Sequence, residues 1–283
     1  MSDSNSEFSH SSAAARAVAH VAARSVGDPL DPALRTHVHF HPDRLFRGEP
    51  ILAAMTRDGV YRSQFETGTS NGGLTAHPGG DRWRWENRIF GGDYDDVPPE
   101  ARPRYGALDH RWRPRGASPR FGSSYLRLAA HTLTRTTFCF PDSVHEPRDF
   151  GVAERMGLIP LADAARGDPL DDYIEAQVHG PIRFATDIEA LVLDPCFRGT
   201  DVERLARGLG CAVEWHGGFV LSTDVLKQHG DYRGQEYVEW GLALARDGRL
   251  TAREIGDASR AGGHDPQSLK RVWHYVARFG ADV

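Results

Sequence analysis

The alternation of apolar and polar residues between Asp172 and Phe197 constrains the fold of this chain more than any other feature. Two runs in this segment, "YIEAQVHG" and "IEALVLD", repeat with the two-residue period of a β-strand and flank a turn. From about Thr223 onward the pattern becomes helical, in "GQEYVEWGLALARDG", "TAREIGDASRAGG" and "DPQSLKRVWHYVARFG". Strands followed by a run of helices indicate an α+β fold with a helical C-terminal unit.

The helical unit carries its own start signals. Thr251 is a helix-capping residue, and the pair Asp265-Pro266 is typical of a helix start. We expect the apolar residues of this unit to form one face that docks on the rest of the chain. They are Trp240, Leu242, Leu244, Ile255, Leu269, Val272, Trp273 and Val276.

Elsewhere the sequence predicts several further elements. Before the core, Ala13 to Ser25 reads as a helix by its alanine content, and residues 1–12 read as a disordered tail. Strands are predicted in "THVHFHPDRL", "GSSYLRLA", "TLTRTTFCF" and "AVEWHGGFVLS", and helices in "GEPILAAMTRDG", "GVAERMGLIPLADAARG" and "TDVERLARGLG". The rest of Val60 to about Pro141 reads as long irregular connections. We therefore expect a tail (1–12), an α+β catalytic-type domain (13–222) and the helical unit (223–283).

Composition limits the cellular setting and the partners. Of the 283 residues 26% are charged, and no run approaches the ~18 consecutive apolar residues of a membrane span. The start of the chain lacks the basic and apolar stretches of a secretory signal, and three cysteines without CxxC spacing suit a reducing compartment. We expect a cytoplasmic protein, or an effector exported without a classical signal, with no membrane partner. The net charge of −5 argues against broad binding to nucleic-acid backbones.

The first candidate site is the histidine run "HVHFH". On a strand, His37, His39 and His41 would point to one face, where their imidazoles could share a metal ion. Three ligands from one strand without an obvious fourth seldom complete a tetrahedral site. We therefore expect pocket-lining histidines and no bound metal, with a metal-dependent hydrolase as an alternative.

The second candidate combines Arg62, in "GVYRSQFETGTSNGG", with Glu175, in "YIEAQVHG". A planar guanidinium beside a Gly/Ser/Thr loop can grip a diphosphate through bidentate, charge-assisted hydrogen bonds. A glutamate on a strand that faces a cleft can bind a sugar hydroxyl and stabilise an oxocarbenium-like transition state. Together they suit cleavage of a nucleotide-sugar bond, although each also occurs as an ordinary ion-pair partner or surface residue.

Six motifs appear in order: "HVHFHPDRL", "DGVYRSQFETGTSNGG", "WENRIFGGDY", "RPRYGALD", "SPRFGSSYLRL" and "RTTFCFPDS". Over roughly Thr36 to the C-terminus the chain resembles the bacterial and fungal family known as domain of unknown function 3626. More distantly, the order of elements resembles ADP-ribosyltransferases of the arginine-serine-glutamate type. That resemblance implies an ADP-ribosyltransferase-like mixed β core with long loops.

The distant resemblance also implies roles for individual residues. Arg62 would hold the diphosphate of NAD, Ser123 would brace the nicotinamide pocket, and Glu175 would be the catalytic carboxylate. Apart from the resemblance, Glu66 is the other acid to consider if Glu175 is not catalytic. Further NAD-binding residues would be Ser63, Gln64, Thr69, Ser70, Asn71, Ser124 and His39. The chain departs from the type by carrying Phe-Gly-Ser-Ser for Ser-Thr-Ser, and Tyr173 two residues before the glutamate. Tyr173, Asp172 or Gln177 would then serve the acceptor side.

These observations predict an NAD-dependent mono-ADP-ribosyltransferase that acts on a protein or nucleic-acid acceptor, as a toxin, an effector or a housekeeping enzyme. NAD would be a substrate, and no metal would be needed. The alternatives are the metal-dependent hydrolase built on His37, His39 and His41, and a non-catalytic module that recognises phosphate. No Gly-x-Gly-x-x-Gly or Walker-type loop occurs in the sequence, which disfavours a Rossmann oxidoreductase or a P-loop NTPase.

Overall fold

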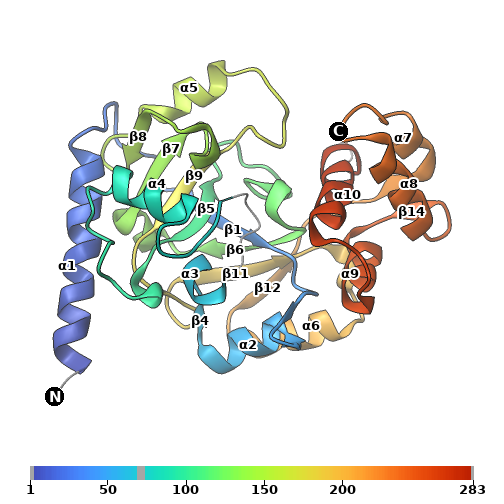
Figure 1. Cartoon of the computed structure of the whole chain (residues 1–283), viewed down its shortest axis with the longest axis horizontal. Helices are drawn as coiled ribbons and strands as arrows, with labels where there is room; N and C mark the ends of the chain where they lie inside the picture. The colour runs from blue at the N-terminus through green and yellow to red at the C-terminus, as the bar shows by residue number, and fades with distance from the viewer. Residues whose placement is uncertain (1–2, 69–73, 282–283) are drawn as a thin grey trace.

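The computed structural model of the chain describes residues 3–68 and 74–281, which form an α+β fold around one large mixed sheet (Figure 1). The order of its eight strands is β12-β11-β6-β1-β5-β9-β7-β8. Neighbours pair antiparallel except β11 and β12, which are parallel. The strands are β1 (Thr36–Phe40), β5 (Arg104–Leu108), β6 (Ser124–Leu128), β7 (Thr136–Phe140), β8 (Asp149–Val152), β9 (Ile174–Val178), β11 (Ile188–Leu193) and β12 (Ala212–Trp215).

Three two-stranded sheets surround the large one. They pair β2 (Leu45–Phe46) with β3 (Glu49–Pro50), β4 (Val60–Tyr61) with β10 (Ile182–Arg183), and β13 (Leu221–Ser222) with β14 (Arg249–Leu250). The strands predicted in "YIEAQVHG" and "IEALVLD" are β9 and β11, but three strands of the large sheet lie between them. The segment that joins them supplies β10, which pairs with β4, so β9 and β11 do not form a hairpin.

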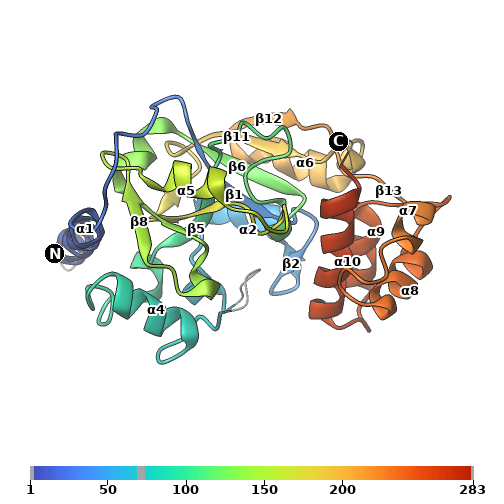
Figure 2. The same ribbon diagram turned by 90° about the horizontal axis from the view of Figure 1, so that it is seen from above.

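Successive side chains of a strand point to opposite faces of the sheet. Apolar side chains therefore project from both faces of the large sheet, and helices cover both. Val38 and Phe40 of β1 pack with α2 (Ile51–Asp58) and α6 (Asp201–Ala206). Elsewhere α5 (Leu158–Ala164) packs on β7 and β9. A further cluster joins α1 (Asp3–Ala22) and α4 (Asp81–Ile89) to β7 and β8. In both views α1 lies at the opposite end of the molecule from the C-terminal helices (Figure 2).

The C-terminal helices are α7 (Thr223–Lys227), α8 (Gln235–Leu244), α9 (Ala252–Ala261) and α10 (Pro266–Phe279). Both predicted starts are confirmed: Thr251 caps α9 in a capping box with Glu254, and Asp265 caps α10 with Pro266 in the first turn. The predicted apolar residues belong to one cluster that also includes Phe197 and Phe219. The helices therefore dock on the rest of the chain through a shared core.

Some elements differ from the prediction. The N-terminal helix begins at Asp3, within the segment read as a tail. Between Gly151 and Gly157 the chain completes β8 and turns before α5 starts, so the predicted helix is shorter. The sequence predicts mostly irregular connections from Val60 to about Pro141. This segment also contains α4, β5 and the short α3 (Gln64–Thr67). α4 lacked a clear apolar pattern because its inward side chains include Arg82 and Glu86. Within the described ranges, no helix is both long and apolar enough to cross a membrane.

Candidate functional site

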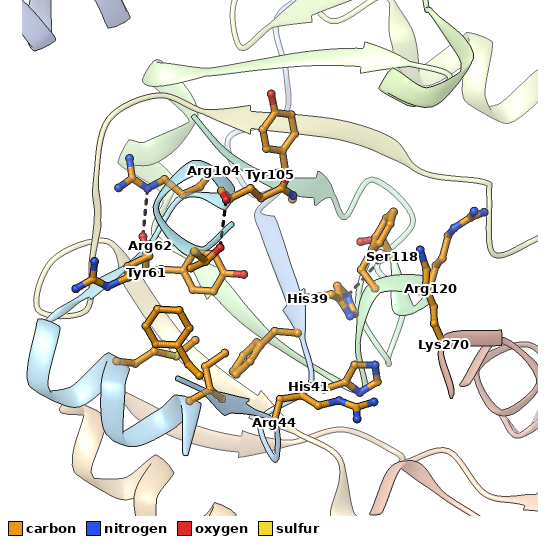
Figure 3. Close-up of a pocket in the computed structure, with 18 of the residues that line it drawn as sticks. His39, His41, Arg44, Tyr61, Arg62, Arg104, Tyr105, Ser118, Arg120 and Lys270 are labelled. Carbon is orange, nitrogen blue, oxygen red and sulfur yellow. Dashed lines mark hydrogen bonds between the residues drawn. The ribbon is translucent and has the colours of Figure 1, made fainter. Parts of the chain in front are cut away.

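A pocket of about 780 Å³ opens beside three neighbouring strands, β1, β5 and β9 (Figure 3). His39 from β1, Tyr105 from β5 and Glu175 from β9 line it, and α2, α4 and α10 contribute further wall residues. Its volume falls within the ~300–1,000 Å³ that is usual for sites that bind small molecules and cofactors. The pocket is therefore large enough for a dinucleotide-sized ligand.

The charged residues of this pocket are mostly cationic. Three carboxylates, Asp58, Asp142 and Glu175, face seven arginine and lysine side chains. The cationic residues are Arg44, Arg47, Arg62, Arg82, Arg104, Arg120 and Lys270. Asp58 is paired with Arg62 at 2.8 Å, and Asp142 accepts the hydroxyl hydrogen bond of Tyr173. A lining of this charge favours an anionic ligand, and Glu175 is the carboxylate best placed to act on it.

Glu175 owes its position to the register of the sheet. On β9 it alternates with Ile174 and Ala176, which pack with α5, so its side chain points to the other face. Its partners on the two neighbouring strands are the small residues Ala107 and Cys139. These small neighbours leave room for the carboxylate, which is only 6% exposed but still lines the pocket.

Four neighbours among the described residues contact the Glu175 carboxylate, one of them the Cys139 thiol, which donates to Oε1 at 3.8 Å. The Ser143 hydroxyl donates to Oε2 at 2.8 Å, and the Ser143 amide donates to the same oxygen at 3.3 Å. The Gln177 amide donates to Oε1 at 3.0 Å. Arg82 of α4 places Nη1 3.9 Å from Oε1 and donates to Ser143 Oγ at 2.8 Å. The carboxylate is thus oriented by donors, the arrangement that suits a fixed negative charge.

Burial raises the pKa of Glu175 above its ordinary value of 4.5, and the charge of Asp142 adds to the rise. Arg82 and the hydrogen bonds from Ser143 and Gln177 act in the opposite direction and favour the ionised form. The same burial that raises the pKa also strengthens any interaction of the carboxylate with a cationic ligand atom.

Arg62 also lines the pocket. It follows β4, which belongs to a small sheet, and it does not close a strand of the large sheet. Its guanidinium is one-third exposed and pairs with Asp58 at 2.8 Å and Glu66 at 3.3 Å. Glu66 in turn pairs with the buried Arg104 at 3.1 Å (Figure 3 shows Arg62 and Arg104 on the same side). Arg62 is therefore held in place by a network of charges.

Arg44 differs from Arg62 and Arg104 in having no ion-paired carboxylate for its guanidinium among the described residues. It lines the pocket on the side of His41, and its guanidinium has no hydrogen bond or ion pair among the residues that the structure describes. Burial lowers its pKa from 12.5, while the charge of Asp43 raises it. An arginine remains charged under such a shift, so Arg44 offers a half-buried cation with unused donors to a ligand.

The other predicted NAD-binding residues are scattered. Gln64 lines the pocket, whereas Ser63 caps α3 and donates to Pro99 O at 2.7 Å. Thr69, Ser70 and Asn71 lie outside the described residues. Ser123 and Ser124 are buried on the β6 side and are not among the residues that line the pocket. Ser124 Oγ accepts from Asp194 N at 3.1 Å, which links β6 to the turn after β11.

The predicted acceptor-side residues lie close to Glu175. Tyr173 is buried, donates to Asp142 and packs edge-on against Phe121. Gln177 is buried and holds Glu175 Oε1, while its own carbonyl accepts from Thr137 at 2.9 Å. Asp172 pairs with Arg111 and with Arg113. None of the three is among the described residues that line the pocket.

His37 and His39 lie on one face of β1, and His41 follows the strand. His39 Nδ1 is 3.0 Å from Gly122 O, and Ser118 N donates to its Nε2 at 3.3 Å. Both ring nitrogens are thus in use, and burial lowers its pKa to about 3, so the ring is neutral. His37 stacks on Tyr125 with ring centroids 4.3 Å apart. Across the described ranges, no three His, Cys, Asp or Glu side chains are grouped so that they could hold a metal ion.

Sequence reasoning missed Ser143, Arg82 and Tyr105. Ser143 lies in a single turn of 3₁₀-helix capped by Asp142, and Arg82 comes from the helix that the sequence did not predict. Tyr105 donates to Glu86 at 2.6 Å, and the Arg82 guanidinium lies 3.9 Å from the centre of its ring. The motif "FPDS" carried a capping signal for this turn, but nothing local linked it to a glutamate 32 residues later.

One family model matches almost the whole folded chain. It is described as "Protein of unknown function (DUF3626)" and covers residues 35–163 and 155–278. A search of curated proteins finds no match. The matched ranges include every described residue that lines the large pocket, from His39 on β1 to Lys270 on α10.

Proposed function

The chain belongs to the family of proteins of unknown function DUF3626, and we propose that it is an NAD-consuming mono-ADP-ribosyltransferase. The observation that carries the proposal is Glu175, an oriented and buried carboxylate in a pocket otherwise dominated by arginine and lysine. NAD combines a cationic nicotinamide, a ribose and an anionic diphosphate. A pocket that combines the Glu175 carboxylate with seven arginine and lysine side chains matches both charges of that molecule.

The reaction breaks the bond between the ribose C1′ and the nicotinamide nitrogen. Nicotinamide leaves with the bonding electron pair, and positive charge develops on the ribose. A nucleophile of the acceptor then bonds to C1′ and loses its proton. Glu175 would stabilise the developing positive charge and hold the ribose hydroxyl, and its donors from Ser143 and Gln177 would keep it oriented.

The diphosphate would lie on the cationic walls. We assign Arg62 and Arg44 to it, because both line the pocket and present guanidinium donors that can chelate two oxygens. Arg44 has unused donors, and Arg62 would share its donors between the ligand and its two carboxylate partners. The proposal gives Ser123 no contact with the ligand, because it does not line the pocket.

Two other acidic residues that could be considered, Glu66 and Asp142, stabilise the local structure. Glu66 pairs with Arg62 and Arg104 and accepts from the Ser63 amide at 2.7 Å in the capping box of α3. Asp142 accepts from Val144 N at 3.2 Å and from Tyr173. Glu66 does not line the pocket, and Asp142 caps the turn that carries Ser143, whereas Glu175 lines the pocket with its carboxylate held by side-chain and backbone donors, so we choose Glu175 as the catalytic residue. The proposal extends to the fold: β1, β5 and β9 would be the central strands of an ADP-ribosyltransferase-like core.

The test is incubation of the purified chain with NAD, with and without a chelator, followed by measurement of free nicotinamide. Release that survives chelation, and that Glu175→Gln abolishes, supports the transferase. Hydrolysis of some other substrate that the chelator stops would support the metal-dependent hydrolase instead. NAD binding without release in the parent would support the non-catalytic module. The matched control is Glu214→Gln on β12, a partly exposed strand glutamate paired with Arg127 at 2.6 Å.

A further inference from the structure

A second pocket of about 220 Å³ adjoins the large one and shares Arg120, Gln267 and Lys270 with it. Six described residues line it, four of them cationic and none a carboxylate. They are Arg120, Arg233, Gln267, Lys270, Arg271 and His274. The four from α10 follow the spacing i, i+3, i+4 and i+7, so they lie along one side of that helix, next to its apolar stripe.

His274 gives this pocket an unsatisfied buried group. The residue is only 5% exposed, and both of its ring nitrogens are buried without a hydrogen-bond partner in the described part of the chain. Burial lowers its pKa to about 2, and Arg120, Arg233, Lys270 and Arg271 lower it further. The ring is thus neutral, with one N–H donor and one acceptor unused. Buried polar atoms are normally paired, so both ring nitrogens are available to a ligand in this pocket.

The cations of this pocket also crowd one another. Burial lowers the pKa of Lys270 to about 8, and the charges of Arg120 and Arg271 contribute. The carboxylates that compensate lie outside the lining: Asp171 pairs with Arg120, and Asp168 pairs with Arg233 at 3.0 Å and with Arg278 at 3.6 Å. A ligand with two negative charges would relieve this repulsion better than one with a single charge.

We propose that this second pocket binds a phosphate monoester carried by the acceptor of the transfer reaction. Its volume is below the usual range for whole small-molecule ligands, so it suits one group of a larger molecule. Phosphate offers two charges and several acceptor oxygens for arginine, lysine and imidazole donors. The shared wall of Arg120, Gln267 and Lys270 places that group next to the pocket that contains Glu175. The acceptor role rests on the proposed function, whereas phosphate binding itself does not.

The experiment measures binding of inorganic phosphate to the full chain by calorimetry, with histidine NMR as a second readout. Arg271→Gln and Lys270→Gln should each weaken binding about tenfold, the scale of one lost hydrogen bond between charged groups. Lys227→Gln on α7, an exposed lysine paired with Asp224, is the matched control and should bind as the parent does. Phosphate should also raise the pKa of His274, because it places negative charge beside the ring. Equal binding by all four proteins would overturn the site.

Further arms test whether the pocket recognises a phosphate monoester. Adenosine monophosphate and phosphoserine should compete with inorganic phosphate, and adenosine and serine should not. Competition by neither monoester would overturn the proposed ligand. Displacement of phosphate by NAD would assign the pocket to NAD and overturn the acceptor role. If the chain binds phosphate but never releases nicotinamide from NAD, the phosphate site is supported and the transferase function is contradicted. Failure of the phosphate site and failure of the proposed function therefore give different results.

Discussion

The Ser143 hydroxyl donates a 2.8 Å hydrogen bond to Glu175 Oε2, although the two residues lie on different elements 32 positions apart. The same hydroxyl accepts a 2.8 Å hydrogen bond from Arg82 Nη1. Ser143 thus relays the positive charge of α4 to the carboxylate and fixes the direction in which Glu175 points. We therefore regard Ser143 and Arg82 as positioning residues for Glu175.

Replacing Ser143 by alanine should lower turnover more than it weakens NAD binding, by about tenfold, since one orienting hydrogen bond to a charged group is lost. The loss of a donor should also raise the pKa of Glu175 further, so the acid limb of the pH profile should move to higher pH. Ser143→Thr keeps the hydroxyl and should restore much of the activity. An unchanged pH profile in Ser143→Ala would show that the hydroxyl only supports the local fold.

The pH dependence of the parent follows from Glu175. Its ionised form is the active one, and its pKa is raised above 4.5. Activity should therefore rise with pH through that raised pKa, and the acid limb should lie above pH 4.5. Nicotinamide release measured across the acid range, with protein shown to be folded at each pH, checks this. An acid limb below pH 4.5 would contradict the burial argument.

Glu175→Gln should leave NAD binding largely intact while nicotinamide release falls ~100-fold or more, because the amide keeps the size but not the charge. The folded chain holds the Glu175 proton more tightly than the unfolded chain does, so this group costs stability above its raised pKa. The amide removes that cost, and the melting temperature at neutral pH should be no lower than that of the parent. Turnover within a few-fold of the parent would exclude Glu175 as the catalytic carboxylate.

Arg62→Lys and Arg44→Lys should weaken NAD binding, because lysine keeps the charge but loses the bidentate fork. The effect should be larger for Arg44, whose donors have no other described partner, than for Arg62, which also holds Asp58 and Glu66. Direct NAD titration of both variants checks the order. Arg204→Lys, an exposed arginine paired with Asp201 on α6, is the control. Unaltered binding in both variants would place the diphosphate elsewhere in the pocket.

Truncation after Ser222 should give insoluble protein. It removes α7 to α10 and with them Trp273, which is fully buried and donates to Pro119 O at 2.9 Å. Phe197 and Phe219, each 1% exposed in the intact chain, would lose their cover. A soluble fragment 1–222 with a cooperative melting transition would show instead that the helices form an independent domain.

Several local features of this protein were determined by the sequence alone. The caps at Thr251 and Asp265 and the alternation that makes β9 depend on contacts within about four residues, and they form as predicted. Glu175 was recognisable as a strand residue with the chemistry of a catalytic carboxylate. These features do not depend on how distant strands pair.

Tertiary structure alone decided which of these residues meet. Strand order is set by pairing over long sequence separations, which local alternation does not encode. Three strands of the large sheet therefore lie between β9 and β11, although the two runs are close together in the sequence. That order brings β1, β5 and β9 together at the pocket and leaves Ser123 and Ser124 outside its lining. It also places the helix-borne Arg82 behind Ser143, and Arg120 across from the α10 side chains of the second pocket. A site built from several elements is fixed by packing, because each of its side chains is positioned by a different distant neighbour.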